Sequence, residues 1–371
     1  MTRRLLLSSL LLSSAVSAAW NIEVVASNVL PDLAATPKLQ AAFRRVWMPT
    51  PIGPMPFDYT AIAFEDQVTG FIKLARRVGT GSWTVDSLQQ GRWPSVALDK
   101  YGAAHVTYYS PNASWVPVIV HAKYSPGAGN CGTSNNYTCN VVKQPDTIPV
   151  ASHNSEVRVG DDDSIHVMFD NGSSSMYLRK TPADAGFVWQ ASPHGGPFSI
   201  QLDSTNRLHT VMQSAYIAQY PTLIEHDAWN PFQVMSDTDT GINLPRLASV
   251  LDSSNRAHTC LTSTGGSASP LKYGWEAPPS PYGSVSTVSS GYATDCSIAL
   301  KSDGTPGISY RNTFVTGVLY AEKITNFWSI EYVDTQDNVG FSSSLVMNAS
   351  SKPMIAYYDR TYNRVKFARS E

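Results

Sequence analysis

Four histidines recur at one position of a repeated pattern, and histidine is the side chain best suited to proton transfer and metal binding near neutral pH. In each repeat an apolar run leads into an Asp-containing polar turn, and the histidine opens the next apolar run: His105, His166, His209 and His258. A ring of imidazoles could hold zinc, which takes histidine nitrogens at about 2.0–2.1 Å. The histidines open second strands, however, about 4.8 Å outside the innermost ones, where neighbouring repeats of a ring diverge. We therefore predict no metal site, and we expect each imidazole to hydrogen-bond its own turn or the next repeat.

A charged pair interrupts one apolar run. Glu156 and Arg158 alternate in "SEVRVGDD" (155–162), where the corresponding positions of other repeats carry Ser, Ala or Gln. A buried carboxylate and guanidinium are costly unless they are paired. Two interpretations stay open: a self-satisfied ion pair that joins two repeats, or an anion-binding or acid–base element.

Further candidates for chemistry lie in segments that do not repeat. The catalytic candidates, with the charged pair included, are Glu156, Arg158, His153, His194 and Arg311. The candidates for ligand binding are aromatic: Trp93, Trp115, Tyr216, Tyr292, Phe314, Phe341 and Tyr358. Aromatic faces provide contact area for a sugar ring or an apolar small molecule. Nucleophile-elbow, zinc-binding and phosphate-loop motifs are absent from the sequence, so we predict a ligand site without a cofactor.

The repeat itself predicts the elements that must position these residues. The apolar residue before each turn is Leu98, Val159, Leu202, Leu251, Leu300 and Met347, at intervals of 61, 43, 49, 49 and 47 residues. Short alternating runs separated by Gly, Asn, Asp and Ser turns are typical of β-strands. Intervals near these lengths are typical of four-stranded propeller blades.

The two ends of the chain complement each other. "IAFEDQVTGFIKLAR" (62–76) matches "IAYYDRTYNRVKFAR" (355–369) and supplies a seventh unit. The C-terminal unit stops after its third strand, and "WNIEVV" (20–25) has the signature of the missing fourth. We predict an all-β, seven-bladed propeller over 20–371 in which 20–25 complete the last blade and remove an open sheet edge. The blades fall near 26–90, 91–145, 151–193, 196–237, 244–290, 295–336 and 341–371; six blades is the alternative.

The chain resembles secreted seven-bladed β-propellers over its mature length. In general character it is similar to the fungal propeller pericyclases of the hetero-Diels–Alderase type. That resemblance implies a cofactor-free cyclase of natural-product biosynthesis, with one composite pocket on the loop face that positions an apolar or aromatic substrate. Two alternatives stay open. One is a uronate lyase, in which Arg neutralises the carboxylate and His or Tyr takes the α-proton; the other is a glycan-binding lectin, which the non-repeating loops disfavour.

The N-terminal segment and the composition indicate export. Residues 1–19, "MTRRLLLSSLLLSSAVSAA", have the basic, apolar and small-residue regions of a signal peptide. Net charge is −2 without a basic tract, which disfavours nucleic-acid binding, and no other segment is apolar enough to span a bilayer. We expect a secreted monomer whose partner is a small molecule or sugar in the channel mouth. The candidate glycosylation sites are Asn112, Asn136, Asn171 and Asn348.

Four cysteines in an exported chain permit two disulfides. Cys131 and Cys139 flank a polar insertion, and we expect them to pair. Counting residues along the strands places Cys260 and Cys296 at opposite ends of strands in neighbouring blades. The two residues would then be separated by roughly 10 Å along the strand direction. That exceeds disulfide reach, so two buried thiols are favoured over a bridge.

Overall fold

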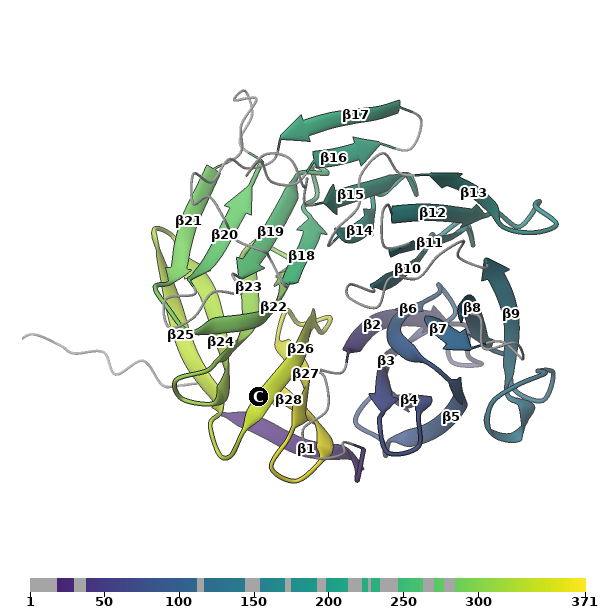
Figure 1. Ribbon diagram of the computed structural model, residues 1–371, viewed down its shortest axis with the longest axis horizontal. Helices are drawn as coiled ribbons and strands as arrows, with labels where there is room; N and C mark the ends of the chain where they lie inside the picture. Colours follow the sequence, from purple (N-terminus) through teal and green to yellow (C-terminus); the bar gives the residue numbers. More distant parts are fainter. Residues whose placement is uncertain are drawn as a thin grey trace, which may run out of the picture.

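The computed structural model describes residues 19–29, 38–111, 117–143, 154–170, 175–191, 198–212, 222–225, 228–233, 246–262, 270–276 and 284–371. These residues form seven four-stranded antiparallel sheets that surround a common centre (Figure 1). The seven-bladed propeller predicted from the repeats is therefore confirmed. None of the helices in the described ranges is long and apolar enough to cross a membrane.

Each blade runs outward from an innermost strand. Blade one contains β2 (Leu39–Met48), β3 (Met55–Asp66), β4 (Phe71–Val78) and β5 (Thr84–Gln90). Blade two contains β6 (Arg92–Leu98), β7 (Ala104–Pro111), β8 (Pro117–Tyr124) and β9 (Tyr137–Lys143), with the short helix η1 (Thr133–Asn135) before β9. Blade three contains β10 (Ser155–Val159), β11 (Ile165–Asp170), β12 (Ser175–Lys180) and β13 (Val188–Ala191).

The remaining four blades repeat this order. Blade four contains β14 (Phe198–Leu202), β15 (Leu208–Met212), β16 (Thr222–Glu225) and β17 (Ala228–Gln233). Blade five contains β18 (Arg246–Leu251), β19 (Ala257–Thr262), β20 (Leu271–Trp275) and β21 (Ser284–Ser289). Blade six contains β22 (Ala293–Leu300), β23 (Pro306–Asn312), β24 (Gly317–Ile324) and β25 (Phe327–Asp334). Blade seven contains β26 (Val339–Met347), β27 (Pro353–Asp359), β28 (Arg364–Ser370) and, from the other end of the chain, β1 (Trp20–Ser27).

The ring closes through the N-terminal strand, as predicted. β1 pairs antiparallel with β28, from Trp20 opposite Ser370 to Ser27 opposite Arg364, and the purple and yellow strands lie side by side in Figure 1. Trp20 also packs edge-on against Tyr320 of blade six, with ring centroids 5.9 Å apart. The closing strand is thereby joined to two blades.

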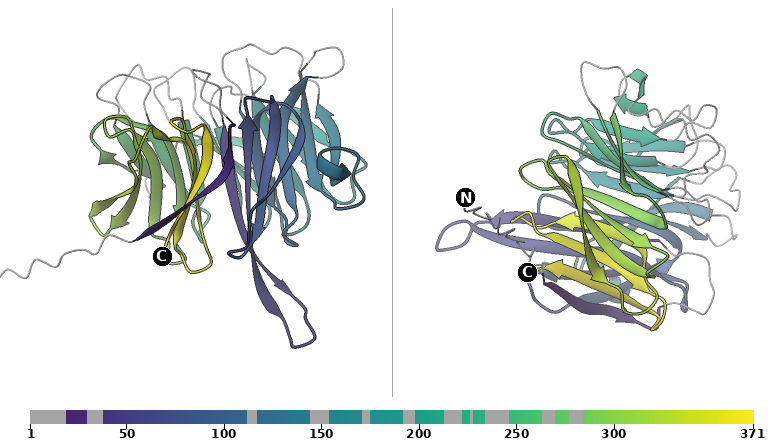
Figure 2. Two further views of the ribbon diagram at one scale, coloured as in Figure 1. Left: turned by 90° about the horizontal axis from the view of Figure 1, so that it is seen from below. Right: turned by 90° about the vertical axis from the view of Figure 1, so that its left-hand side faces the viewer.

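Two faces of the propeller differ in their connections. The turn between the first and second strands of a blade lies on one face, which we call the hairpin face; the β2–β3 hairpin extends farthest from it (Figure 2). The innermost strands begin, and the second strands end, at the opposite face, which we call the loop face. A residue's position along its strand therefore decides the face to which it belongs.

Both cysteine pairs are bonded. The expected Cys131–Cys139 disulfide is confirmed, and Cys260 and Cys296 also form a disulfide, with Cα atoms 6.3 Å apart. The expectation of free thiols at the second pair was wrong. Antiparallel register places Cys260 opposite Ala248, three residues above the hairpin-face end of β18, and Cys296 lies four residues above the same end of β22. The two residues therefore lie at nearly the same height in adjacent blades. Two disulfides are typical of exported proteins.

Candidate functional site

The repeated histidines hold the hairpin-face turns. Nε2 of His166 lies 2.8 Å from Ser164 Oγ, and Nε2 of His209 lies 3.1 Å from Asp203 Oδ2. His258 and His105 lie 3.5 and 3.4 Å from the carboxylates of their own turns. The expectation that each imidazole hydrogen-bonds its own turn or the next repeat agrees with the turn contacts of His105, His166 and His209. His258 differs, because its hydrogen bond goes to the Tyr273 hydroxyl of its own blade, 2.6 Å from Nδ1. Among the described residues, no group of three or more His, Cys, Asp or Glu is placed to hold a metal ion.

Glu156 belongs to a ring of acceptors that join the blades. At one level of the innermost strands, a side-chain oxygen accepts the backbone N–H of the next blade's innermost strand. Ser95 Oγ accepts from Val157 at 3.0 Å, and Gln40 Oε1 accepts from Val96 at 3.1 Å. Glu156 Oε2 occupies this place in blade three and accepts from Ile200 at 3.0 Å.

Arg158 completes the arrangement around Glu156. One of its Nη atoms lies 3.4 Å from Glu156 Oε2, and the other donates to the carbonyl of Val157 at 2.8 Å. Both side chains line a central cavity of about 520 Å³ formed by the innermost strands. These contacts match the structural interpretation, a self-satisfied pair that ties two blades together.

A second repeated position lies at the loop-face end of the second strands. There Tyr358 is fully buried, and its hydroxyl donates to the carbonyl of Glu65 in the next blade at 2.9 Å. Glu65 Oε1 accepts from Trp93 N, again in the next blade, at 2.6 Å. Tyr109 donates in the same way to the carbonyl of Asp170. The sequence analysis assigned Tyr358 to ligand binding, whereas the structure places it in the core between blades seven and one.

In blade six this position carries Arg311, and its environment is different. The guanidinium lies 3.9 Å from the ring centroid of Phe341 and donates to Asn338 Oδ1 at 3.0 Å. Arg360 covers the same ring at 4.0 Å. We call Arg311, Phe341 and Arg360 the arginine–phenylalanine cluster; it lies on the loop face where blades six and seven meet.

The cluster concentrates positive charge in a desolvated place. Arg311 is only 9% exposed, and within the described part of the chain its Nε has no hydrogen bond and no carboxylate lies within 4 Å of its guanidinium. Burial lowers the pKa of Arg311 and of Arg360, and the nearby charge of Asp295 opposes that shift for both. A guanidinium remains protonated in proteins, so the cluster favours an anion.

Backbone bulges aim the residues around this cluster. The innermost strands of blades two, six and seven break register at the same level, where Trp93, Asp295 and Ser342 have positive φ angles of 54°, 55° and 55°. Non-glycine residues in this region cost about 1–3 kcal/mol and gather at functional sites. Bulges redirect side chains, and here one of them presents Asp295 to the two arginines.

The other aromatic candidates divide between surface and core. Tyr292 and Phe314 form an exposed pair on the loop face of blade six, with ring centroids 5.4 Å apart and exposures of 38% and 75%. Trp93 is half-buried and packs edge-on against Tyr109 at 5.4 Å. The structure thus brings Arg311 and Phe341 together and places Tyr292 and Phe314 on the same blade edge.

Several predicted residues cannot be placed. His153, His194, Trp115 and Tyr216, and the sequons at Asn112 and Asn171, lie outside the described residues. Asn136 and Asn348 lie in turns, and glycosylation at either stays a prediction.

Sequence analysis missed two polar residues next to the channel mouth. Glu65 is 5% exposed; burial raises the pKa of its carboxyl, although hydrogen bonds from Trp93 and Lys38 oppose the shift. Lys38 is 9% exposed and donates from Nζ to the carbonyl of Ser155 at 2.6 Å. Glu65 could have been found by aligning the second-strand ends, because it stands where "IAYYD" (355–359) has Tyr358.

These features define a closed, seven-bladed β-propeller with a cationic site at the edge of its loop face. The chain is similar in structure to a PL25 ulvan lyase bound to -[GlcA(1-4)Rha3S]-, with a TM-score of 0.61 and 11% identity over 93% of this chain and 94% of that one. A second structure of a PL25 ulvan lyase has a TM-score of 0.58 and 10% identity over 83% of this chain and 89% of that one. A third similar structure is a mutant of the α-L-arabinofuranosidase Arb93A from Fusarium graminearum in complex with an iminosugar inhibitor. Its TM-score is 0.51, with 10% identity over 94% of this chain and 97% of that one.

Comparisons by sequence add no relative. No protein-family model matches the chain, and no curated protein matches it. At 10–11% identity the structural likeness shows the propeller fold alone.

Proposed function

We propose that the protein binds an acidic polysaccharide on its loop face and cleaves it as a uronate lyase. The observation that carries this proposal is Arg311, a nearly buried guanidinium without a carboxylate partner among the described residues, stacked on Phe341 beside Arg360. Within the described part of the chain, Asp295 is the one nearby carboxylate for two guanidinium groups, and a uronate carboxylate would balance the remaining positive charge. Arginine pairs with carboxylates through two parallel N–H···O bonds, and Phe341 holds both guanidinium planes in place.

Pairing with Arg311 would also prepare the sugar for elimination. Neutralising the carboxylate makes the hydrogen on the adjacent C5 more acidic, because the negative charge that develops on removal of that proton is stabilised. A general base takes the C5 proton, the C4–O bond to the next sugar breaks, and a C4–C5 double bond forms. The departing oxygen takes up a proton. The sequence candidates for the base are His153 and His194.

The comparisons agree with a carbohydrate ligand. The ulvan lyase structure with the higher TM-score holds a glucuronate-containing disaccharide, and the arabinofuranosidase holds an iminosugar. The pericyclase hypothesis gains no support from these neighbours. A cycloaddition pocket should be deep and mainly apolar, whereas the central cavity contains Gln40, Glu156 and Arg158. The loop-face cluster is cationic.

The test is an elimination assay on the secreted protein with glucuronate-containing polysaccharides, with a neutral polysaccharide as the control substrate. The unsaturated product is detected by its ultraviolet absorbance. We expect cleavage of the acidic substrates only, and a loss of about 10²-fold or more in kcat/KM for Arg311→Gln, the usual cost of removing a donor that stabilises developing charge. Arg256→Gln, an exposed arginine paired with Asp252 on the hairpin face, is the matched control.

The same experiment separates the lyase from the lectin. Replacing His153 and His194 singly by Gln should abolish cleavage in one of the two variants while leaving binding intact. Binding of acidic polysaccharide without any unsaturated product would favour a lectin, for which the exposed Tyr292–Phe314 pair offers a sugar-stacking surface. Cleavage by Arg311→Gln at the wild-type rate would refute the assignment of this site.

A further inference from the structure

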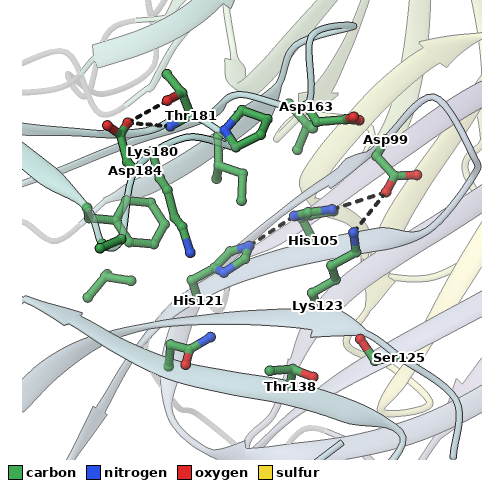
Figure 3. A pocket seen from close by; sticks show the side chains of 18 of the residues that line it. Asp99, His105, His121, Lys123, Ser125, Thr138, Asp163, Lys180, Thr181 and Asp184 are labelled. Atoms are coloured by element: carbon green, nitrogen blue, oxygen red, sulfur yellow. Dashed lines mark hydrogen bonds and ion pairs between the residues drawn. The ribbon is translucent and has the colours of Figure 1, made fainter. Parts of the chain in front are cut away.

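A second cavity of about 610 Å³ lies between blades two and three, beside the hairpin-face turns (Figure 3). Its size falls within the range of small-molecule sites. Asp99 and Asp163 of the two turns line it, so it lies at the opposite ends of the blades from the arginine–phenylalanine cluster. Nothing in the proposed lyase site uses these residues.

Three side chains form a chain of contacts that ends at the cavity. Asp99 Oδ2 lies 3.4 Å from His105 Nε2, and His105 Nδ1 lies 3.0 Å from His121 Nε2. Asp99 also accepts the backbone N–H groups of Tyr101 and Ala103 at 2.9 and 2.8 Å. Burial disfavours the ionised form of Asp99, but these hydrogen bonds, that of His105 included, outweigh it and lower its pKa to about 2. Asp99 is therefore an acceptor only.

The proton positions on His105 and His121 follow from the role of Asp99 as an acceptor. His105 must carry its proton on Nε2 to donate to Asp99, so Nδ1 of the neutral ring is an acceptor. His121 then donates from Nε2, and its own Nδ1 is left with a lone pair. His121 is 4% exposed, lines the cavity, and makes no hydrogen bond from Nδ1 to any described residue. Burial, with the nearby charges of Lys123 and Lys180, holds the pKa of His121 well below its usual value, so the acceptor persists at neutral pH.

A cation, Lys180, lies beside this acceptor, and together with the hydrogen bonds from Thr181 its charge helps to lower the pKa of the nearby Asp184 carboxyl. The Lys180 side chain extends toward His121 in Figure 3, and its ammonium makes no ion pair or hydrogen bond within the described part of the chain. The carboxylates that line the cavity are already engaged. Asp99 contacts Lys123 at 3.4 Å, Asp163 contacts Lys100 at 2.9 Å, and Asp184 accepts two hydrogen bonds from Thr181 at 2.7 Å.

The remaining walls suit a small polar ring. Phe187 packs edge-on against His121 with ring centroids 5.8 Å apart, and Val159 and Ile165 add an apolar side. Thr138 and Asn140 supply further hydrogen-bonding groups. The cavity therefore offers an acceptor, a cation and an apolar wall within one partly open space.

We propose that this cavity is a second ligand site, for a hydroxycarboxylate of monosaccharide size such as a uronic acid. A ligand hydroxyl donates to His121 Nδ1, and the ligand carboxylate pairs with Lys180. The pyranose ring lies against Phe187. The proposal does not depend on the lyase function, because none of these residues belongs to the loop-face site.

The test uses the full secreted protein and three probes. Glucuronate has both groups, glucose lacks the carboxylate, and acetate lacks the hydroxyls. We expect saturable binding of glucuronate by calorimetry, with glucose and acetate each weaker by about tenfold or more, as is usual when one of two cooperating polar contacts is lost. The His121 imidazole resonances, followed by nitrogen-15 NMR, should move with glucuronate.

Variants then locate the binding. Lys180→Gln should weaken glucuronate binding about tenfold or more, and His121→Gln should weaken both glucuronate and glucose. Lys352→Gln, an exposed lysine near the β26–β27 turn, should leave the affinity unchanged. Unchanged affinity in Lys180→Gln, equal affinity for glucuronate and glucose, or an unmoved His121 signal at saturation would each overturn the proposal. A loss caused by Arg311→Gln alone would place the binding at the loop face.

Discussion

At the scale of single residues, equivalent positions in the seven blades carry different side chains and serve different roles. Six of the seven innermost strands carry an oxygen-bearing side chain at the inter-blade acceptor position; the exception is Ala248. Serine is sufficient in most blades, and Glu156 makes the same contact with a charged group that needs Arg158 nearby. The second-strand ends also contact the next blade: Tyr358 donates to the carbonyl of Glu65, and Arg311 donates to Asn338 Oδ1. Among the described residues, Nε of Arg311 has no hydrogen bond.

A first prediction concerns Glu156. Replacing it by Ala leaves the buried N–H of Ile200 without an acceptor, which typically costs about 1–3 kcal/mol. Glu156→Gln keeps an acceptor oxygen and should cost clearly less. Urea unfolding measures both. If Glu156 were catalytic instead, Glu156→Gln would lose activity at nearly unchanged stability.

A second prediction concerns the pH dependence of stability. Burial lowers the pKa of His105 and, more strongly, of His121, in surroundings that include Asp99, Lys123 and Lys180. Above about pH 6.5, the ordinary pKa of histidine, both rings are neutral in the folded and unfolded chains. Below about pH 6.5 the two histidines bind protons in the unfolded chain but stay neutral in the folded one. The free energy of unfolding therefore falls as the pH falls, by about 1.4 kcal/mol per pH unit for each histidine.

Urea midpoints at about pH 7.5 and 5.5, on either side of the ordinary histidine pKa, test this dependence. His121→Gln should show a smaller fall between these two values than the wild-type protein. An equal fall in both proteins would mean that His121 does not contribute.

At the scale of elements, antiparallel register and bulges decide which side chains of adjacent blades contact each other. Register places Cys260 beside Ala248, and the bulge in β22 sets two residues, Asp295 and Cys296, against one on β23. The same bulge that presents Asp295 to the arginines therefore also lies next to the disulfide. The bond between blades five and six supports the blade that holds Arg311.

A third prediction follows for the two disulfides. In the chain-entropy relation, the Cys260–Cys296 bond, with a sequence separation of 36, is worth about 4 kcal/mol. The Cys131–Cys139 bond, with a separation of 8, is worth about 2–3 kcal/mol. A double Cys260→Ser/Cys296→Ser variant should therefore unfold at lower urea than the Cys131→Ser/Cys139→Ser variant. The reverse order would show that native contacts around the first loop dominate.

At the scale of the whole molecule, stability depends on closing the ring. β1 supplies the outer strand of blade seven, and Val25 and the following Val29 are buried in the core shared with blade one. Without it, β28 would expose an unpaired edge, which invites aggregation.

A fourth prediction is that a chain beginning at Asn28 loses its cooperative unfolding transition or aggregates. Light scattering and calorimetry measure both effects. A Trp47→Ser variant, which changes a 64%-exposed residue of the protruding β2–β3 hairpin, should behave like the wild-type protein. A truncated chain that stays monomeric with an unchanged Tm would contradict the role of β1 in closure.

The sequence by itself determined the architecture: the number of blades, the strand order and the closing strand, because each blade repeats one local pattern of apolar runs and turns. It also indicated why the histidines recur, since their partners are only a few residues away. What only the tertiary structure decided are contacts between blades: the Cys260–Cys296 bond, the burial of Tyr358, and the stacking of Arg311 and Arg360 on Phe341. Such contacts depend on the relative height of residues in adjacent sheets, which register and single-residue bulges set and which no local pattern records.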